Sequence, residues 1–434
     1  MKVQFIYPAF DRHAQSHPEL REFVPCNEYI GPPSLGIASV AAATPPGIEV
    51  AFVDDRIHPV TERLPEADLY ALSFFTPAAT RALEIGDFLR AQGKPVVMGG
   101  IFPTMMPGEC EGHCDALVQG EGEPVWPELL ADFAAHRLKK RYRAAAPADL
   151  ETLSPPRVDL YLDAESEDFA PDDYPLQTSR GCPFACDCCV LPDVMGKKIR
   201  HFPESTVEQT LLAFAARGKL CSLTEDTSFM FVSGARRRFR ALLRALAERY
   251  LQQGARLSYI GCSMPLLLNV EPEVLSEVRR AGIDRFYLVC GFDPITREAF
   301  GRGDAAAMAK ADECIRRCFD VGVEPYISLL AGNDSDDRGV FDRILEFCER
   351  TRIQTAEFVV ATPYPGTPMW RKLVTENRIL DRTWKRYNDA NVVFRPAQMS
   401  PEELQEGYLR MWREFYRSRK HLAQADRGRR TIQF

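Results

Sequence analysis

The residues whose type and spacing most clearly indicate a chemical function are four cysteines in one short segment. They lie within eight consecutive positions: Cys182, Cys186, Cys188 and Cys189. Gly181 and Pro183 prevent a helix from running through the segment. Thiolates on such a loop can surround one small inorganic group, and they are the usual protein ligands of iron–sulfur clusters. Zinc sites more often use two separated pairs, so the pattern favours a cluster over zinc, buried structural thiols or a disulfide.

The spacing Cys182-x3-Cys186-x2-Cys189 resembles the cluster motif of the radical S-adenosylmethionine (radical SAM) superfamily. In that family three cysteines hold three irons of a [4Fe-4S] cluster, and the fourth iron is left for SAM. The resemblance implies reductive cleavage of SAM to a 5′-deoxyadenosyl radical. The family usually has an aromatic residue before the third cysteine, where this chain has Cys188. We therefore expect Cys189 to be the third ligand, with Cys188 as the alternative.

Composition and charge narrow the class of protein. A chain of 434 residues with 45% hydrophobic residues is long enough for two or three domains with sizeable cores. The net charge of −7 argues against nucleic acid as a partner, because phosphate binding rests on excess Lys and Arg. The sequence has no apolar run of about 18 residues and no signal-peptide layout, and its thirteen cysteines fit reduced thiols. We expect a cytoplasmic protein with no membrane partner.

Segments of strand length alternate with helical segments in the first part of the chain. The predicted strands are 2–10, 48–55, 67–75, 94–100 and 116–123, and the predicted helices between them include 34–43 and 80–93. Strands separated by helix-sized segments indicate parallel βαβ units. Residues 1–145 are therefore predicted to form a Rossmann-like parallel sheet, in which ligands bind beyond the carboxyl ends of the strands.

The loops at these strand ends resemble the cobalamin-binding domain of many B12-dependent radical SAM enzymes. This resemblance implies cobalamin as a further cofactor, with Gly99, Gly100 and Gly120 letting the backbone lie against its flat ring. Histidine ligation of cobalt is not expected, because the segment Asp11-x-His13-x-x-Ser16 only approximates the ligating motif. In addition, Phe102 stands where many relatives have histidine. The alternative is a domain that binds no cobalamin and packs against the rest of the protein, with His13 as a surface or capping residue.

The alternation of strands and helices resumes after a Pro- and Asp-rich linker at 146–172, which we expect to cross the surface. Six β/α units at 173–368 predict a partial (β/α)6 barrel that is open on one side, in agreement with the fold that the cysteine motif implies. Residues 369–434 are predicted to form a helical carboxyl-terminal region whose aromatic residues could cover that open side. The whole chain is thus an α/β protein.

Residues at the carboxyl ends of barrel strands point into the reaction chamber of barrels of this type, so the site residues are sought there. The resemblance implies that three of these residues are catalytic: Glu225, Asp226 and Asp293. It also implies that four residues bind SAM or flank the cluster: Gly181, Phe184, Asp293 and Ser328. The segment 362–367 also resembles the Pro-x-Pro-Gly-Thr-Pro segment of B12-type radical SAM enzymes.

An enzyme is expected, because a cluster loop with an open iron has little use in a binding module. The leading hypothesis is cobalamin-dependent C-methylation of a small molecule, most naturally in secondary metabolism. The first alternative is cobalamin-independent dehydration, since the chain is also similar to the radical SAM diol dehydratase of aminoglycoside antibiotic biosynthesis. A second alternative is an electron-transfer or scaffold protein that binds SAM without turnover. The expected partners are the small-molecule substrate and an external electron donor, such as flavodoxin, ferredoxin or a dedicated reductase.

Overall fold

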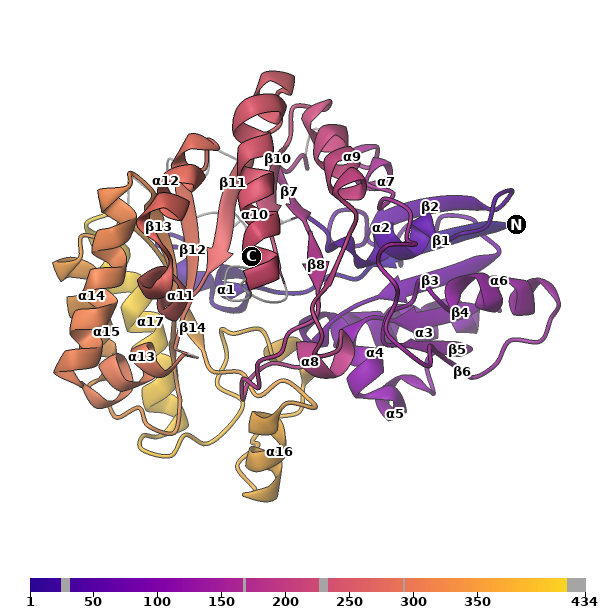
Figure 1. The fold of residues 1–434 in the computed structure, drawn as a ribbon. Helices are drawn as coiled ribbons and strands as arrows, with labels where there is room; N and C mark the ends of the chain where they lie inside the picture. Colours follow the sequence, from indigo (N-terminus) through magenta and orange to yellow (C-terminus); the bar gives the residue numbers. More distant parts are fainter. Residues whose placement is uncertain (25–31, 167–168, 226–232, 292, 420–434) are drawn as a thin grey trace.

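Two six-stranded parallel sheets organise the chain and lie side by side in Figure 1. The computed structural model describes residues 1–24, 32–166, 169–225, 233–291 and 293–419. Asp226, one of the residues predicted to be catalytic, lies outside these ranges. Within them, no helix combines the length and the apolar character needed to cross a membrane.

The first sheet has the strand order β2-β1-β3-β4-β5-β6, and all its pairs are parallel. Its strands are β1 (Lys2–Tyr7), β2 (Glu49–Asp54), β3 (Leu69–Ser73), β4 (Val96–Gly99), β5 (Ala116–Gln119) and β6 (Arg141–Arg143). The order reverses between β1 and β3, and ligands of such sheets bind in the crevice at that point. The predicted Rossmann-like sheet is confirmed. The short edge strand β6 was not predicted.

Helices pack on both faces of the first sheet (Figure 1). They are α2 (Leu35–Ala42), α3 (Ala79–Ala91), α4 (Ile101–Met105), α5 (Pro107–Cys110) and α6 (Trp126–Ala134). The short helix α1 (His13–Ser16) lies apart from them, on the barrel side of the molecule in Figure 1. In α3 the apolar positions recur every three or four residues, so one face of the helix is buried. Gly86 lies on that face, where a Cβ atom would come within 2.4 Å of the carbonyl oxygen of His113. Glycine therefore allows α3 to pack closely against the segment before β5.

The second sheet has the strand order β14-β13-β12-β11-β10-β7 and is also entirely parallel. Its strands are β7 (Asp173–Leu176), β10 (Leu220–Leu223), β11 (Leu257–Cys262), β12 (Arg285–Cys290), β13 (Glu324–Ala331) and β14 (Thr355–Val360). Strands that follow one another in the chain are neighbours in space, as in a barrel. Among the described residues β7 and β14 do not pair, so the predicted partial (β/α)6 barrel is confirmed.

The helices of the barrel cover the outer face of its sheet (Figure 1). The long ones are α9 (Glu204–Ala215), α10 (Ser233–Ala245), α12 (Pro272–Arg280), α14 (Ala305–Asp320) and α15 (Val340–Arg350). The short ones are α11 (Met264–Asn269) and α13 (Pro294–Thr296). A further short helix, α8 (Leu191–Val194), lies toward the first domain in Figure 1. Cys314 and Cys318, one turn apart on α14, are fully buried, as expected for free cysteines in a core.

The helix α17 (Pro401–Arg417) covers the edge strand β14. The Tyr416 hydroxyl donates to the carbonyl oxygen of Ala356 (2.7 Å) and accepts from its N–H group (3.2 Å). The indole N–H of Trp412 donates to the carbonyl oxygen of Phe358 (3.1 Å). These bonds satisfy backbone groups that an edge strand leaves unpaired. The carboxyl-terminal region is helical as predicted, and it also includes α16 (Pro368–Thr375).

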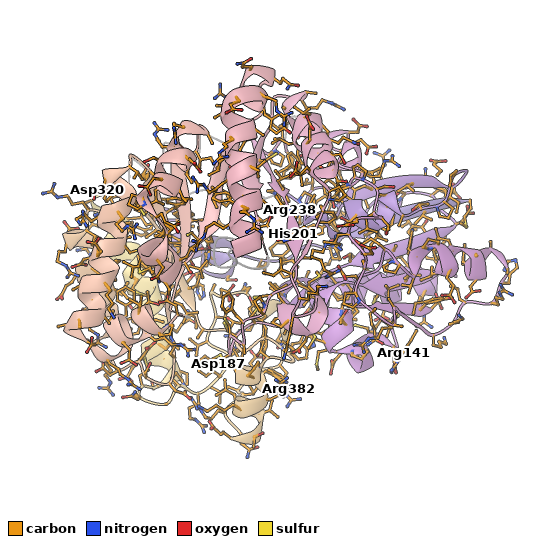
Figure 2. All side chains as sticks on the ribbon, viewed as in Figure 1. Arg141, Asp187, His201, Arg238, Asp320 and Arg382 are labelled. Atoms are coloured by element: carbon orange, nitrogen blue, oxygen red, sulfur yellow. The ribbon has the colours of Figure 1, made fainter. Side chains whose placement is uncertain are left out.

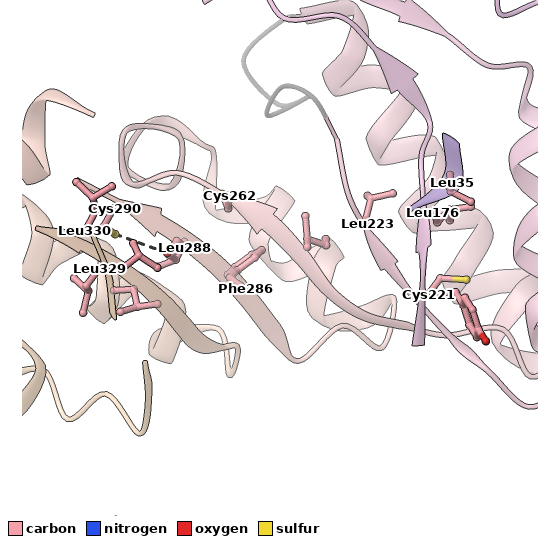
Figure 3. Packing of buried hydrophobic residues seen from close by; sticks show 14 of the residues in the cluster. Leu35, Leu176, Cys221, Leu223, Cys262, Phe286, Leu288, Cys290, Leu329 and Leu330 are labelled. Atoms are coloured by element: carbon pink, nitrogen blue, oxygen red, sulfur yellow. Dashed lines mark hydrogen bonds between the residues drawn. The ribbon is translucent and has the colours of Figure 1, made fainter. Parts of the chain in front are cut away.

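A continuous apolar core joins the two sheets. Leu35 of α2 belongs to the same buried cluster as Leu176 of β7, and Figure 3 shows these two residues near each other. The linker contributes to this cluster through α7 (Asp159–Leu162). Tyr161 of α7 is buried, packs on Phe52 with 4.8 Å between the ring centres, and donates to the carbonyl oxygen of Ser34 (2.6 Å). The linker is thus packed into the protein at this point and does not simply cross its surface.

Candidate active site

The loop that carries the four clustered cysteines, residues 182–189, starts from a two-stranded antiparallel ladder. The ladder consists of β8 (Ser179–Arg180) and β9 (Arg200–His201). Gly181 leaves β8 with φ of 102°, and a Cβ atom at this position would lie 2.2 Å from the carbonyl oxygen of Lys198. Only glycine fits there. The N–H of Cys182 then donates to the carbonyl oxygen of Gly196 (3.0 Å), which fixes the start of the loop.

The four thiols of this loop are free of disulfide bonds. Cys182 is buried, Cys186 is exposed, and Cys188 and Cys189 are half-buried. The N–H of Cys189 donates to the carbonyl oxygen of Cys186 (3.3 Å), so these two residues share one tight turn. The N–H of Leu191 donates to the sulfur of Cys189 (3.4 Å). Burial and the neighbouring Cys182 raise the pKa of the Cys186 thiol.

The donor set of the loop fits an iron–sulfur cluster in its chemistry. Within the ranges described above, no three His, Cys, Asp or Glu side chains are gathered closely enough to hold a single metal ion. A cluster is larger than one ion, and its thiolates lie correspondingly further apart. An N–H group directed at a sulfur, as at Cys189, is also a feature of cluster sites, where such bonds tune the potential.

The exposed part of the loop contacts α16 of the carboxyl-terminal region and the segment that follows α13 of the barrel. The carbonyl oxygen of Asp187, labelled in Figure 2, accepts from the N–H of Met369 in α16 (2.8 Å). The Asp187 carboxylate pairs with Arg297 (3.3 Å), which follows α13 at the end of β12. The end of the fourth barrel strand therefore lies beside the cysteine loop. Phe184 is 41% exposed.

Asp293 and Ser328, two of the residues predicted to contact SAM, lie at different places in the barrel. Asp293 caps α13: its carboxylate accepts from the N–H groups of Ile295 (3.0 Å) and Thr296 (3.1 Å) and from the Thr296 hydroxyl (2.5 Å). The Asp293 side chain is therefore already used to cap the helix. Ser328 is buried in β13, opposite Glu357 of β14 in the register of the sheet.

A cavity of about 620 Å³ lies between the carboxyl edge of the first sheet and the barrel. Residues from both domains line it, and apolar and aromatic side chains predominate. Among the residues singled out in the sequence, it is lined by Gly99, Gly100, Gly120 and Glu225. The lining from the barrel also includes Arg180, Leu191 and Tyr259, so the cavity reaches the segments on both sides of the cysteine loop. The four cysteines, Asp293 and Ser328 do not line it.

Glycine is found at the edge of the first sheet for a different structural reason at each of two positions. Gly100 has φ of 100°, and a Cβ atom there would lie 2.6 Å from the carbonyl oxygen of Phe74. Gly120 also has a positive φ, 75°, but no atom lies within 4 Å of the position of its Cβ. Gly100 is thus required by the packing of the loop. Gly120 opens onto free space in the cavity lining, as a backbone that approaches a flat ring requires.

Glu225 connects the end of β10 to the start of the cysteine loop. Its carboxylate accepts from the N–H of Thr178 (2.6 Å) and from the hydroxyl of Ser179. Since Ser179 lies three residues before Cys182, the carboxylate holds the strand from which the loop departs. In this arrangement Glu225 lines the cavity and also positions the ladder.

A buried hydrogen-bond network connects the loop after β1 to the barrel and to α17. His13 is 7% exposed; its Nε2 lies 2.9 Å from a carboxylate oxygen of Glu357, and its Nδ1 lies 2.9 Å from the Tyr408 hydroxyl. The Tyr287 hydroxyl donates to the other oxygen of Glu357 (3.0 Å). Burial alone raises the pKa of Glu357, but His13, Arg12 and the Tyr287 hydroxyl together outweigh it and lower that pKa. The interpretation of His13 as a surface or capping residue is wrong.

Asp389 is a residue of the cavity that sequence reasoning did not find. It has φ of 63°, an uncommon value for a residue other than glycine. Burial raises the pKa of its carboxyl group, which is hydrogen-bonded to Tyr364. Both side chains line the cavity. The signal in the sequence is the pair Asn388-Asp389, because Asn and Asp tolerate the left-handed conformation.

Comparisons with known proteins agree with this architecture. A model of the B12 binding domain matches residues 29–130, and a domain of unknown function (DUF4070) matches residues 367–433. The bacteriochlorophyllide d C-12(1)-methyltransferase of Chlorobaculum tepidum is 27% identical over 391 residues, which are 88% of this chain and 82% of the relative. The hopanoid C-2 methylase of Rhodopseudomonas palustris is 25% identical over 361 residues, 80% of this chain and 65% of the relative.

Among solved structures, the fold is similar to that of the radical S-adenosylmethionine methyltransferase TsrM from Kitasatospora setae. The TM-score is 0.65 at 18% identity, and the match covers 94% of this chain and 83% of TsrM. The B12-binding domain, together with the similarity to methyltransferases over 88% of the chain, supports the type of radical SAM enzyme that carries a B12-binding domain. The resemblance that the cysteine spacing and the strand-end loops indicated is thereby confirmed, and so is the class of enzyme. The roles of the individual site residues in this radical SAM enzyme remain predictions.

Proposed function

We propose that the protein is a cobalamin-dependent radical SAM methyltransferase that forms a C–CH3 bond on a small molecule. The observation that carries the proposal is the shared cavity, in which the Gly120 edge of the first sheet faces Tyr259 and Glu225 of the barrel. A flat cofactor on one side and SAM on the other would both reach a substrate bound in such a space. Relatives named as methyltransferases over most of the chain support the same reaction.

The proposal assigns the cofactors to specific parts of the chain. Cys182, Cys186 and Cys189 would hold a [4Fe-4S] cluster, and the Leu191 N–H directed at the sulfur of Cys189 favours Cys189 over Cys188. Cobalamin would lie over Gly120 at the first sheet, without ligation by His13, because both ring nitrogens of His13 already have partners. When bound, the cluster would supply the electron that cleaves SAM, and cobalamin would supply the methyl group.

The side chains around the cavity would hold these groups in place and exclude water. The Glu225 carboxylate fixes the ladder that carries the cysteine loop, through Thr178 and Ser179. Aromatic side chains make most of the cavity wall apolar, which protects a radical from solvent. Because the cluster has to be reduced from outside, the proposal includes an external electron donor, such as flavodoxin, ferredoxin or a dedicated reductase.

Dehydration stays the second candidate because of one observation. The Asp389 carboxyl group lines the cavity, and burial raises its pKa, so it can hold a proton beside Tyr364. Loss of water from a substrate radical needs such a group, whereas hydrogen abstraction followed by methylation does not. Glu225 is less suited to this task, since both of its oxygens accept hydrogen bonds from the chain.

The test uses anaerobic protein with its cluster reconstituted. Ultraviolet–visible spectra are recorded with and without hydroxocobalamin, and products are measured after reduction with SAM and a panel of small substrates. Bound cobalamin, with 5′-deoxyadenosine and S-adenosylhomocysteine formed together, is the expected result. 5′-Deoxyadenosine without S-adenosylhomocysteine would favour dehydration. No cobalamin binding and no methylated product would refute methyl transfer, with Cys182→Ala as the cluster-free control.

A further inference from the structure

A buried group of four charges joins the cysteine loop to the loop that follows β5. Its members, called the charge cluster below, are Glu121, Glu123, Arg180 and Arg200. The two glutamates flank Gly122, one and three residues after Gly120. Arg180 lies two residues before Cys182. The side chains of Arg180, Glu121 and Glu123 are at most 5% exposed, so the charges are removed from water.

Hydrogen bonds connect all four side chains of the charge cluster to one another. Arg180 donates from Nη1 to Glu121 (2.9 Å) and from Nη2 to Glu123 (2.8 Å), so its guanidinium bridges two carboxylates of one loop. Arg200 donates from Nη1 to the other oxygen of Glu121 (2.8 Å), and that oxygen also accepts from the N–H of Ala148 (2.8 Å). Burial alone lowers the pKa of Arg180, but the two glutamates outweigh it and raise that pKa. The formal charges of the two arginines and the two glutamates sum to zero.

The positions of the two arginines explain why the glutamates are needed. Arg180 and Arg200 are direct partners in the β8–β9 ladder. Like charges opposite each other destabilise such a pair. The Glu121 carboxylate lies between them and accepts from both. The ladder that carries the cysteine loop is thus complete only when the loop of the first sheet is in contact with it.

Stability alone does not account for a buried charge cluster. Replacing buried ion pairs by apolar residues of similar volume often leaves a protein as stable or makes it more stable. What the guanidinium of Arg180 adds is geometry, because its planar fork binds carboxylates in a fixed orientation. Arg180, Glu121 and Glu123 also line the cavity, beside Gly120. The charge cluster therefore lies between the two predicted cofactor sites.

We infer that the charge cluster is a clamp that sets the position of the cysteine loop relative to the Gly120 loop of the first sheet. The two sites then face the cavity at a fixed separation. Arg180 is a positioning residue in this scheme, because it acts through the ladder and does not touch the reacting atoms. The identity of the two cofactors rests on the proposed function, whereas the contact between the two loops does not.

Hydrogen–deuterium exchange on the full chain with its reconstituted cluster tests the clamp. Arg180→Lys keeps the charge but loses the fork, and Glu123→Gln is the milder change. Both are expected to raise amide exchange in residues 119–123 and 179–201 together, by roughly tenfold or more, with iron content unchanged. The control is Arg157→Lys, because Arg157 also has a guanidinium paired with a carboxylate, that of Asp159 at 2.7 Å, but is exposed. The control should change neither loop.

Two outcomes of this experiment would overturn the inference. In one, exchange rises only in the cysteine loop. In the other, Glu123→Gln loses iron as fully as Cys182→Ala does, which would make the charge cluster a simple folding element.

A second measurement connects the clamp to the two cofactors. Arg180→Lys should weaken hydroxocobalamin binding and raise the ratio of 5′-deoxyadenosine to methylated product, because SAM cleavage continues while the methyl donor is displaced. Equal affinity and an equal product ratio in wild type and variant would refute this part. If the wild-type protein itself binds no cobalamin, the proposed function fails, and the exchange experiment still decides whether the clamp exists.

Discussion

Replacing His13 by leucine tests how strongly the loop after β1 is tied to the barrel. Leucine fills a similar volume but removes the His13 hydrogen bond to the Glu357 carboxylate, which keeps the hydrogen bond from the Tyr287 hydroxyl. The side chains of His13 and Glu357 are 9% and 7% exposed, so the carboxylate cannot turn to water for compensation. Removing one partner of such a buried pair costs about 3–5 kcal/mol of unfolding free energy. We expect His13→Leu to lower stability by that amount.

His113 offers a matched control. Its ring nitrogen lies 2.8 Å from the Asp87 carboxylate, as close as His13 is to Glu357, but the two side chains are 32% and 60% exposed. An exposed pair of this kind contributes about 0–1 kcal/mol. The measurement is urea unfolding followed by tryptophan fluorescence and far-ultraviolet circular dichroism, with coincident curves as the condition for a single free energy. Equal losses for His13→Leu and His113→Leu would refute the argument from burial.

The Glu357 carboxylate also makes the stability of the folded protein depend on pH. The pKa of Glu357 in the folded protein is lower than its ordinary value of 4.5, so the unfolded chain binds the proton more readily. The stability from this group is complete above pH 4.5 and is lost as the pH falls through the lowered value. The difference in unfolding free energy between wild type and His13→Leu should therefore be largest near neutral pH and shrink in acid.

A double variant tests the same pairing. Adding Glu357→Gln to His13→Leu should lower the unfolding free energy by less than the sum of the two single changes. A difference that grows in acid, or strict additivity, would contradict the pairing.

Two further predictions concern the cysteine loop and the glycines. Cys188→Ala should keep most of the cluster iron and Cys189→Ala should lose it, as iron and sulfide analysis will show; the opposite result would make Cys188 the third ligand. Gly100→Ala should destabilise the protein by several kcal/mol, because the new Cβ would overlap the Phe74 backbone. Gly120→Ala should cost only about 1–2 kcal/mol from its positive φ and instead weaken hydroxocobalamin binding; an equal loss of stability at both positions would argue against a ligand at Gly120.

Local sequence patterns were sufficient for most of the fold. Each predicted strand corresponds to an observed one within a few residues, because apolar runs of strand length between helical segments leave few arrangements other than parallel βαβ units. The strands β6 and β9 were missed, and β8 was predicted only as a continuation of β7. They are two or three residues long, and pairing with other segments creates them, so no periodicity marks them in the sequence.

The candidate site was predicted in part. The cysteines and the glycines at the strand ends are visible in the sequence because their spacing or their backbone freedom is itself the signal. Glu357 gives a weaker signal, as a single carboxylate in an otherwise apolar strand. Its partner His13 is 344 positions away in the chain, and no local pattern connects the two.

The sequence by itself determined the kind of cofactor loop and the two parallel sheets, and it predicted the edge of each sheet at which ligands are expected. These properties depend on residue type and on spacings of a few positions. Only the tertiary structure decided that the two edges share one cavity, that His13 is buried, and that Arg180 bridges two glutamates of the other domain. Contacts between distant segments depend on how the domains pack, and a charged residue has the same signature in the sequence whether water or a buried partner surrounds it.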